Sequence, residues 1–570
     1  MKTMRKIRNM ALATVLGLTM NACSDWLAEE PVSFIGPDSI EDSEAGVDVW
    51  VTGVYSNWLD DMFRWSYFPF VLELDSDYIS GPDWLMATMG AGNFQDAEMV
   101  GKLWKGPYNI IVDAMLASRK IGEMKNISEA CRNNAIGELE FQMAFSYFLM
   151  VRAFGPVPIM EKDVMDGGSY NNPRRPIPEV YDHIIALLED AAAKMYKRGE
   201  SGYKKGHVSA ASAAGLLAKV YATMASAAMP EGTPVTVRTG NGTNARYTAE
   251  EAGTTVYKYN PLVTNVFYKT DVEGYMEMDS MELYGKAAEW AGKVIAGEYG
   301  PVELSDYDDL WKASNRDASE FLFNVQSVGG ETTYCTRIHT YYSGFTANPS
   351  AVTIQSGGWL GCSYNWYRLF DEGDDRIEKG VRHEWQYYYQ VDYNGWFYYP
   401  ESRKSYYATL GDGRTWQYTA DSQCLAFTTK YEDVKDKSAE YTDSSWPFLR
   451  FADVLLIYAE AKNELGERDE AVAALNKVRK RSHAALMAAT PGQDALRSAI
   501  IEERAKELAC EGDRRWDLIR WGIYIDAMNA VMYDDSGIYK ERSAKHLLFP
   551  IPLEEINANK AITGNNPGWN

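Results

Sequence analysis

The sequence predicts a mostly α-helical fold in which pairs of helices form the scaffold and long loops with small β-hairpins lie over it. Two observations support this prediction. Near both ends of the chain, apolar residues recur every three or four positions, which is the spacing of one helix face. Between these stretches, segments rich in Gly, Thr, Asn and Tyr lack this period and contain the turn dipeptides Asn394-Gly395 and Asp412-Gly413.

The N-terminal half contains two predicted helix pairs. The first pair covers residues 104–124 and 135–154, and its second helix carries apolar residues on two faces, so we expect both faces to pack. The second pair begins with Pro178 in a first turn, and its partner helix covers residues 208–227. This partner is rich in alanine, which lets two helices approach closely.

A third predicted pair lies in the C-terminal half, at residues 451–465 and 471–482, with Gly466 ending its first helix. Helix-turn-helix units of this size resemble tetratricopeptide repeats. The long segments 230–283 and 328–445 are predicted to form loops and small sheets over this frame. Within them, Trp385 to Tyr399 is expected to be a hairpin with aromatic faces around an Asn-Gly turn.

The N-terminus predicts export. Residues 1–22 combine a basic start, an apolar run and a small residue before Cys23, as in a secretory signal peptide. The apolar run is shorter than the roughly 20 residues that a membrane-spanning helix needs. A cysteine directly after the small residue resembles the lipobox of bacterial lipoproteins, so we expect Cys23 to carry the lipid. The alternative is a plain signal peptide with an incidental cysteine.

Charge and composition exclude several function classes. The 570 residues include 80 Asp and Glu against 57 Lys and Arg, which gives a formal net charge of −23. Nucleic acid is therefore not an expected partner, because its binding draws on clustered basic residues. The 17 Trp and 38 Tyr greatly outnumber the 19 Phe, so aromatic residues with a polar group are preferred and aromatic binding surfaces are expected.

Cysteine and histidine spacing predicts neither a disulfide scaffold nor a metal site. Five cysteines besides Cys23 are widely scattered without a C-x-x-C motif, although one pair could form in an oxidising compartment. The six histidines lack ligand spacing. Asp75-Ser76-Asp77 begins like a calcium loop but has Ser80 and Met86 where that loop needs Gly and Glu. We expect no cofactor and no metal.

Several segments, in chain order, carry a resemblance to a known family. In the C-terminal half these are Trp446 to Ala461, Ile501 to Trp521, and Phe549 to Pro552 with the ending Asn566-Pro567-Gly568-Trp569. In the N-terminal half they are Cys23 to Leu27, and Tyr147 to Arg152 with Phe154 to Pro158. Together these segments resemble the SusD/RagB family of outer-membrane nutrient-uptake lipoproteins over nearly the whole chain.

This resemblance implies a SusD-like fold with tetratricopeptide-like helix pairs. Residues 1–22 would be the lipoprotein signal peptide and residues 23–570 a single SusD-like domain. Within that domain we expect an N-terminal part at about 23–230, a loop-rich insert at about 230–283 and a C-terminal SusD part at about 284–570. The resemblance also implies a protein anchored in the outer membrane by lipid, facing outward, which captures an oligosaccharide for a SusC-like TonB-dependent transporter.

Two loop neighbourhoods are predicted to bind the glycan, because Trp and Tyr rings fit sugar C–H faces and nearby polar groups bind hydroxyls. By resemblance, the family builds its glycan sites from loops in these two regions. The candidate residues are Trp65, Asp77, Tyr78, Trp84, Asn93 and Phe94 in the first region, and Tyr341, Tyr342, Trp359 and Tyr364 in the second. The hairpin from Trp385 to Tyr399 is a third candidate.

The charged residues of the second C-terminal segment favour structure over chemistry. Charges of both signs alternate at helical spacing from Glu502 to Arg520, which indicates an ion-pair network rather than a catalytic centre. No hydrolase, zinc-protease or phosphate-loop motif occurs, so we expect no catalysis. A surface glycosidase would need two carboxylates flanking one bond, for which Asp75 with Asp77 or Asp374 with Asp375 are the candidate pairs. Capture of peptides or other nutrients in the same architecture remains open.

Overall fold

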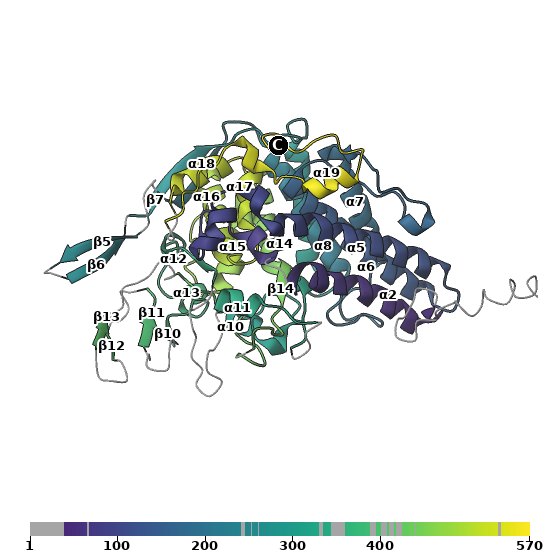
Figure 1. Cartoon of the computed structure of the whole chain (residues 1–570), viewed down its shortest axis with the longest axis horizontal. Helices are drawn as coiled ribbons and strands as arrows, with labels where there is room; N and C mark the ends of the chain where they lie inside the picture. The colour runs from purple at the N-terminus through teal and green to yellow at the C-terminus, as the bar shows by residue number, and fades with distance from the viewer. Residues whose placement is uncertain are drawn as a thin grey trace, which may run out of the picture.

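The structure is a computed structural model in which most of the chain is described. The described residues are 39–64, 68–240, 246–251, 254–259, 261–329, 334–343, 359–387, 395–400, 407–409, 415–417, 425–437, 439–533 and 537–569. The signal peptide, Cys23 and Trp65 lie outside them. Helices fill the body of the molecule, as predicted, and the longer hairpins lie at one end of it (Figure 1). Within the described part, no helix is both long and apolar enough to cross a membrane.

Four long helices form the N-terminal half of the scaffold and pack in chain order, each against the next. They are α5 (Glu98–Glu123), α6 (Glu129–Phe154), α7 (Ile177–Lys194) and α8 (Ala210–Ala227). The shorter α2 (Glu44–Asn57) packs against α5 and α6. Both predicted N-terminal pairs are therefore confirmed, with each helix beginning or ending within a few residues of its predicted bounds.

Local sequence explains where these helices begin and end. The Ser128 side chain accepts a hydrogen bond from a first-turn amide of α6. Gly155 ends α6 with φ 69°, in a region that favours glycine. Every residue of α8 is buried, and a Cβ on Gly215 would lie 2.8 Å from Leu322, so small residues are needed where this helix meets its neighbours.

The C-terminal half repeats this helical packing around one central helix, α14 (Phe451–Glu464), which contacts α8 as well as its own partners. Those partners are α9 (Ser280–Ile295), α15 (Arg468–Arg481) and α16 (Gln493–Glu507). The third predicted pair, α14 with α15, is confirmed. Because α8 contacts both α9 and α14, the two halves of the scaffold form one body.

Shorter helical segments connect these elements. They are η2 (Trp58–Phe63), α3 (Phe68–Glu73), α4 (Asp83–Leu85), η3 (Met86–Gly90), η4 (Phe94–Asp96), η5 (Val164–Asp166), α10 (Tyr307–Leu310), η6 (Ala313–Asn315), α11 (Ile338–Ser343), α12 (Tyr364–Tyr367), α13 (Asp375–Glu378), α17 (Arg514–Arg520), α18 (Tyr524–Val531), η8 (Ala544–Leu547) and α19 (Leu553–Ala558). Several of them lie in the loop-rich segments, where they carry side chains of the candidate site.

The described strands form two-stranded antiparallel sheets. The pairs are β1 (Ile79–Ser80) with β9 (Gly361–Cys362), β2 (Val157–Pro158) with β3 (Arg174–Arg175), β4 (Pro234–Thr239) with β7 (Val263–Tyr268), β5 (Arg246–Glu251) with β6 (Thr254–Tyr259), β8 (Phe321–Val325) with β14 (Trp446–Arg450), β10 (Glu384–Tyr387) with β11 (Gly395–Tyr398), and β12 (Tyr407–Thr409) with β13 (Thr415–Gln417). The predicted hairpin is confirmed, because Trp385 of β10 pairs with Phe397 of β11. Its predicted Asn-Gly turn is wrong, because Gly395 already lies in β11 opposite Tyr387. The second turn dipeptide, Asp412-Gly413, lies outside the described residues.

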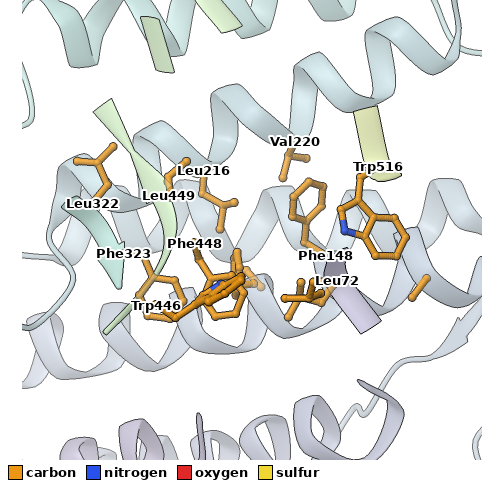
Figure 2. Packing of buried hydrophobic residues seen from close by; sticks show 14 of the residues in the cluster. Leu72, Phe148, Leu216, Val220, Leu322, Phe323, Trp446, Phe448, Leu449 and Trp516 are labelled. Atoms are coloured by element: carbon orange, nitrogen blue, oxygen red, sulfur yellow. The ribbon is translucent and has the colours of Figure 1, made fainter. Parts of the chain in front are cut away.

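The core of the scaffold is an aromatic cluster where β8 and β14 pass the helices (Figure 2). The rings of Phe323 and Phe448 stack with centroids 5.6 Å apart, and Phe145 of α6 contacts both. Trp58 joins the same cluster and donates a hydrogen bond of 2.6 Å to Gln142. One continuous set of buried apolar residues runs from Val47 to Trp569. The predicted subdivision of the chain stays a prediction.

Candidate functional site

The two predicted loop regions lie side by side. Strand β1 pairs with β9 through Ile79 and Cys362, so the loop after β1 and the segment before β9 share one face. A Cβ on Gly81 would approach the Trp359 carbonyl oxygen to 2.9 Å, so a glycine permits this close contact. The pairing thus joins segments separated by just over 280 positions in the sequence.

Two tryptophans meet at this junction. Trp84 of α4 is 52% exposed, and its ring lies edge-on to the half-buried ring of Trp359, with centroids 5.5 Å apart. Tyr341 of α11 is buried behind them and stacks on Trp359 with centroids 5.6 Å apart. The Tyr341 carbonyl oxygen also accepts the Trp359 amide at 2.7 Å, which fixes the tryptophan backbone. The result is a surface aromatic pair on a rigid base.

Charged and polar groups border this pair. The Arg337 guanidinium lies over the rings of Tyr341 and Trp359, at 5.5 and 5.8 Å from their centroids. It also lies over Tyr441 at 5.5 Å and forms an ion pair with the half-exposed Glu440. We call Trp84, Trp359, Tyr341, Arg337 and Glu440 the aromatic site. Arg337 and Glu440 were not among the predicted residues, because their local sequence gives no sign that they lie beside Trp359.

Asp77 and Tyr78, two other candidates from the first region, are buried and form hydrogen bonds with other parts of the chain. Asp77 accepts two hydrogen bonds of 2.8 Å from Arg514, and the Tyr78 hydroxyl donates to the Arg238 carbonyl oxygen. Burial raises the pKa of Tyr78 well above its usual value, so its hydroxyl stays neutral. These two side chains hold the loop before α4 against α17 and β4.

Asn93 and Phe94 lie against another part of the molecule. The Phe94 ring is buried among Phe549 and Trp569 of the C-terminal tail, at centroid distances of 4.8 and 5.8 Å. The Asn93 side chain is exposed and donates to the Ala87 carbonyl oxygen at 2.8 Å. Trp84 and Phe94 belong to one predicted loop region, but Trp84 lies beside Trp359 whereas Phe94 packs against the C-terminal tail.

The second region is divided in the same way. Tyr342 is buried against Tyr431 and Trp446, and burial raises its pKa well above the usual value. Tyr364 is half-buried and stacks on Tyr367 with centroids 6.0 Å apart, beneath the Arg368 guanidinium. Because adjacent side chains of α11 point to different surroundings, Tyr341 reaches the aromatic site and Tyr342 reaches the core.

The carboxylate pairs considered for hydrolysis are held by cations. Asp75 accepts hydrogen bonds from Arg542 at 2.8 and 2.9 Å and from Tyr524 at 2.6 Å, and it forms an ion pair with Arg515. Asp374 accepts two bonds from Arg376, at 2.7 and 2.9 Å. These carboxylates are buried and stabilise the fold. Within the described residues, no group of His, Cys, Asp or Glu side chains could hold a metal ion.

A cavity of about 330 Å³ lies elsewhere, where α6, α8 and α17 meet the C-terminal tail. Its lining is mainly apolar, and Arg152 reaches it while stacked on Phe148 at 3.9 Å. Thr223, Glu273, Tyr275, Arg520 and Lys545 also line it, but its one indole, that of Trp516, is buried, whereas the aromatic site presents the exposed ring of Trp84. For a sugar ligand, the aromatic site is therefore the stronger candidate.

Two family models match the chain in order. Residues 325–569 match the SusD family, and residues 25–222 match a family described as "starch-binding associating with outer membrane". A relative from Formosa agariphila, "SusD-like protein P2", is 26% identical over 575 aligned positions, covering 97% of this chain and 98% of its own.

Solved structures agree on the fold. A SusD homolog from Bacteroides thetaiotaomicron has a TM-score of 0.70 at 21% identity, covering 94% of this chain and 98% of its own. "Surface glycan-binding protein A" from Bacteroides fluxus has a TM-score of 0.64 at 20% identity, covering 92% of this chain and 99% of its own. With both halves of the sequence matched in order and the helical scaffold in common, the chain belongs to the SusD family.

Proposed function

We propose that this protein is a non-catalytic, cell-surface glycan-binding lipoprotein that captures an oligosaccharide at the aromatic site and delivers it to a SusC-like TonB-dependent transporter. The observation that carries the binding step is the exposed Trp84 ring set edge-on to Trp359, with Arg337 and Glu440 at its border. The description of the matching family and the glycan binding for which the Bacteroides fluxus neighbour is named support a carbohydrate ligand.

The chemistry of the aromatic site suits a sugar. A pyranose ring presents apolar C–H groups on its faces, which pack on an exposed indole such as Trp84. Its equatorial hydroxyls need donors and acceptors at the edge of that contact, and Arg337 and Glu440 supply both. Because Trp359 is fixed by Tyr341, little conformational freedom is lost on binding.

The proposed site is narrower than the predicted set. Trp84, Tyr341 and Trp359 belong to it, with Trp84 and Trp359 in direct contact with the ligand and Tyr341 as their support. Asp77, Tyr78, Phe94 and Tyr342 are left out because they are buried within the fold. Asn93 and Tyr364 lie beside other groups, and Trp65 falls outside the described residues.

Anchoring and delivery complete the proposal. Export by the signal peptide and lipidation of Cys23 would hold the protein on the outer membrane, facing outward. The transporter is the proposed protein partner, and the stacked helix pairs offer it a broad surface. Peptide capture in the same architecture is the alternative ligand class. A glycosidase is disfavoured because Asp75, Asp77 and Asp374 are bound by arginines.

Native affinity electrophoresis tests the binding step. Residues 24–570 are run through gels that contain a panel of soluble polysaccharides, with Trp84→Ala and Trp359→Ala alongside. We expect one glycan to retard the wild type, and we expect either substitution to weaken this retardation at least tenfold in glycan concentration, about 1.4 kcal/mol. The matched control is Tyr170→Ala, which removes an exposed ring elsewhere and leaves retardation unchanged.

The outcomes separate the alternatives. Retardation that survives both tryptophan substitutions would place the glycan site elsewhere on the protein. No retardation by any polysaccharide, followed by binding of a peptide mixture in solution, would favour peptide capture.

The delivery step is tested by purifying the tagged full-length lipoprotein from outer membranes in mild detergent. Absence of a co-purifying TonB-dependent β-barrel protein would contradict the proposed partnership.

A further inference from the structure

Two cysteines that are far apart in the sequence meet in the interior. The Sγ atoms of Cys362 and Cys510 lie 3.8 Å apart, and each residue is 1% exposed. Cys362 is the last residue of β9, and Cys510 lies between α16 and α17. Both are free thiols in this structure.

The backbone on each side of this contact is fixed. Cys362 exchanges two backbone hydrogen bonds with Ala426, at 3.0 and 2.8 Å. The Cys510 carbonyl oxygen accepts a bond of 2.6 Å from the Tyr431 hydroxyl. Two residues further, the Gly512 amide donates to the buried Glu73 carboxyl at 2.7 Å. The approach of the two thiols is therefore a consequence of the fold rather than of two freely moving loops.

The thiols also have room to move closer. A disulfide needs an S–S distance of about 2.0 Å, so the gap must shorten by roughly 1.8 Å. A small cavity of about 20 Å³ is lined by both cysteines, together with Glu73 and Ile79. We expect rotation of the two side chains into this space to shorten the gap, with β9 and the loop keeping their places.

We propose that Cys362 and Cys510 form a disulfide bond when the chain folds under oxidising conditions, and that this bond ties β9 to the loop between α16 and α17. Strand β9 begins two residues after Trp359, so the bond fixes one side of the aromatic site to the helical scaffold. This inference concerns covalent structure and does not depend on which nutrient the protein captures.

The chemistry is a thiol–disulfide exchange with a small disulfide such as oxidised glutathione. One cysteine thiolate attacks a sulfur of the reagent, forms a mixed disulfide and releases one thiol. The second cysteine thiolate then attacks the sulfur of the first and releases the second thiol. Two protons and two electrons pass from the cysteines to the reagent, which is reduced to two thiols.

Burial determines when this exchange takes place. The hydrogen bond with Cys362 and the burial of the side chain raise the pKa of the Cys510 thiol well above its usual value. The thiolate, which is the reactive form, is therefore scarce in the folded protein. We expect the bond to form while the segments are still docking, and to resist reductants once the fold is complete.

Peptide mass mapping tests the proposal on the full chain. One sample is exported by cells and purified in detergent without reductant. A second is reduced, unfolded and refolded with oxidised glutathione. Both are denatured and alkylated with iodoacetamide before digestion. We expect a linked peptide pair containing Cys362 and Cys510, lighter by two hydrogen atoms than the sum of the free peptides, while Cys131, Cys335 and Cys424 are alkylated. Alkylation of both Cys362 and Cys510 in both samples, or linkage of either to a different cysteine, overturns the proposal.

Thermal unfolding provides a second readout. Wild type and Cys131→Ala, the matched single-cysteine control, should unfold at a lower temperature after refolding in reductant, which keeps the bond from forming, than after refolding with oxidised glutathione. The double variant Cys362→Ala/Cys510→Ala should unfold at one temperature with and without reductant. An equal reductant-dependent fall in the double variant would show that the effect comes from other thiols.

Discussion

The two halves of the scaffold are both helical, but different interactions hold them together. In the N-terminal half, α6 and α8 are buried mainly through apolar and alanine side chains. In the C-terminal half, α14, α16 and α17 bury charged residues that pair with one another. Arg504 links Asp453 and Asp517 at 2.6 and 2.9 Å, which confirms the predicted ion-pair network.

This difference has a physical consequence. Apolar packing gains free energy from each buried surface and tolerates small changes of register. A buried ion pair gains little net free energy over an apolar pair, but removing one partner leaves a charge without compensation. We therefore expect the C-terminal half to define its geometry more strictly, and the N-terminal half to supply more of the net stability.

The largest effect is expected at Arg450, which is fully buried. Its guanidinium binds Glu320 at 2.6 Å, Glu511 at 2.7 Å and Glu507 at 3.0 Å. Arg450→Met leaves these carboxylates undercompensated, so we expect a loss of about 5 kcal/mol in the free energy of unfolding, measured in urea. Arg175→Met, which breaks exposed pairs, is the control and should cost less than about 1 kcal/mol. Equal losses would remove the distinction between buried and exposed pairs.

A smaller effect is expected in the apolar half. Leu216 of α8 is buried beside the aromatic core (Figure 2). Leu216→Ala should cost about 3 kcal/mol through the lost contacts and the cavity that remains, whereas Leu216→Met should cost less than about 1.5 kcal/mol. Urea unfolding of both variants provides the measurement. If Leu216→Ala proved harmless, apolar packing would not be the main support of this half.

The Leu216 loss should also be independent of pH, unlike that of Arg450. Burial alone would raise the pKa of Glu507, but the charges of Arg481, Arg450 and Arg376 outweigh it and hold the pKa well below its usual value. The stabilisation from this group is therefore complete above about pH 4.3 and is lost as the pH falls further. The cost of Arg450→Met should shrink in acid, while the cost of Leu216→Ala should not.

Glu73 should behave in the opposite way. Burial raises its pKa to about 8, although the Gly512 amide bond opposes the shift. The folded protein therefore holds the proton more tightly than the unfolded chain, so this group destabilises the fold increasingly as the pH rises from about 4.3 towards 8. Glu73→Gln keeps a hydrogen-bond acceptor and removes the titration.

We expect Glu73→Gln to gain roughly 3 kcal/mol relative to wild type between pH 5 and pH 8. Urea unfolding at several pH values measures this difference, with the exposed Glu277→Gln as the control. A constant difference across that range would mean that the carboxyl of Glu73 titrates outside it.

The smallest effect is expected for an exposed pair on α9. Lys293 and Glu289 lie one helical turn apart, with Nζ and Oε1 at 2.7 Å. Lys293→Gln should cost about 0.3–0.5 kcal/mol at low salt, and less at high salt because exposed charges are screened. If the free energy of unfolding fell by more than about 1 kcal/mol and the loss persisted in high salt, exposed ion pairs would contribute more to stability than we expect.

Local patterns in the sequence predicted much of the scaffold. The apolar period gave α5, α6, α7, α8 and α14 within a few residues, because a helix that buries one face must repeat every 3.6 residues. The position of the β10–β11 hairpin was also predicted, but Gly395 lies in β11 opposite Tyr387, so Asn394-Gly395 is not the two-residue turn that the sequence suggested. The order of the motifs also predicted the family, since several segments must agree at once.

The sequence could not separate surface from core within the candidate site. Tyr341 and Tyr342 are adjacent and chemically identical, yet one supports Trp359 and the other packs on Trp446. Asp77 has the composition of a ligand-binding residue, but Arg514, more than 430 positions away, binds it in the interior. Residue type gives only a preference for burial. Whether a polar side chain such as Asp77 is buried depends on a partner such as Arg514, which the fold brings beside it.

The helical scaffold and the family follow from the sequence alone, because periodicity and motif order are properties of contiguous residues. The contact of Trp84 with Trp359, of Arg337 with Tyr441 and of Cys362 with Cys510 became visible in the folded chain alone. Each of these contacts joins segments more than 100 positions apart. Their approach depends on strand pairing and helix packing across the whole chain, which no local pattern encodes.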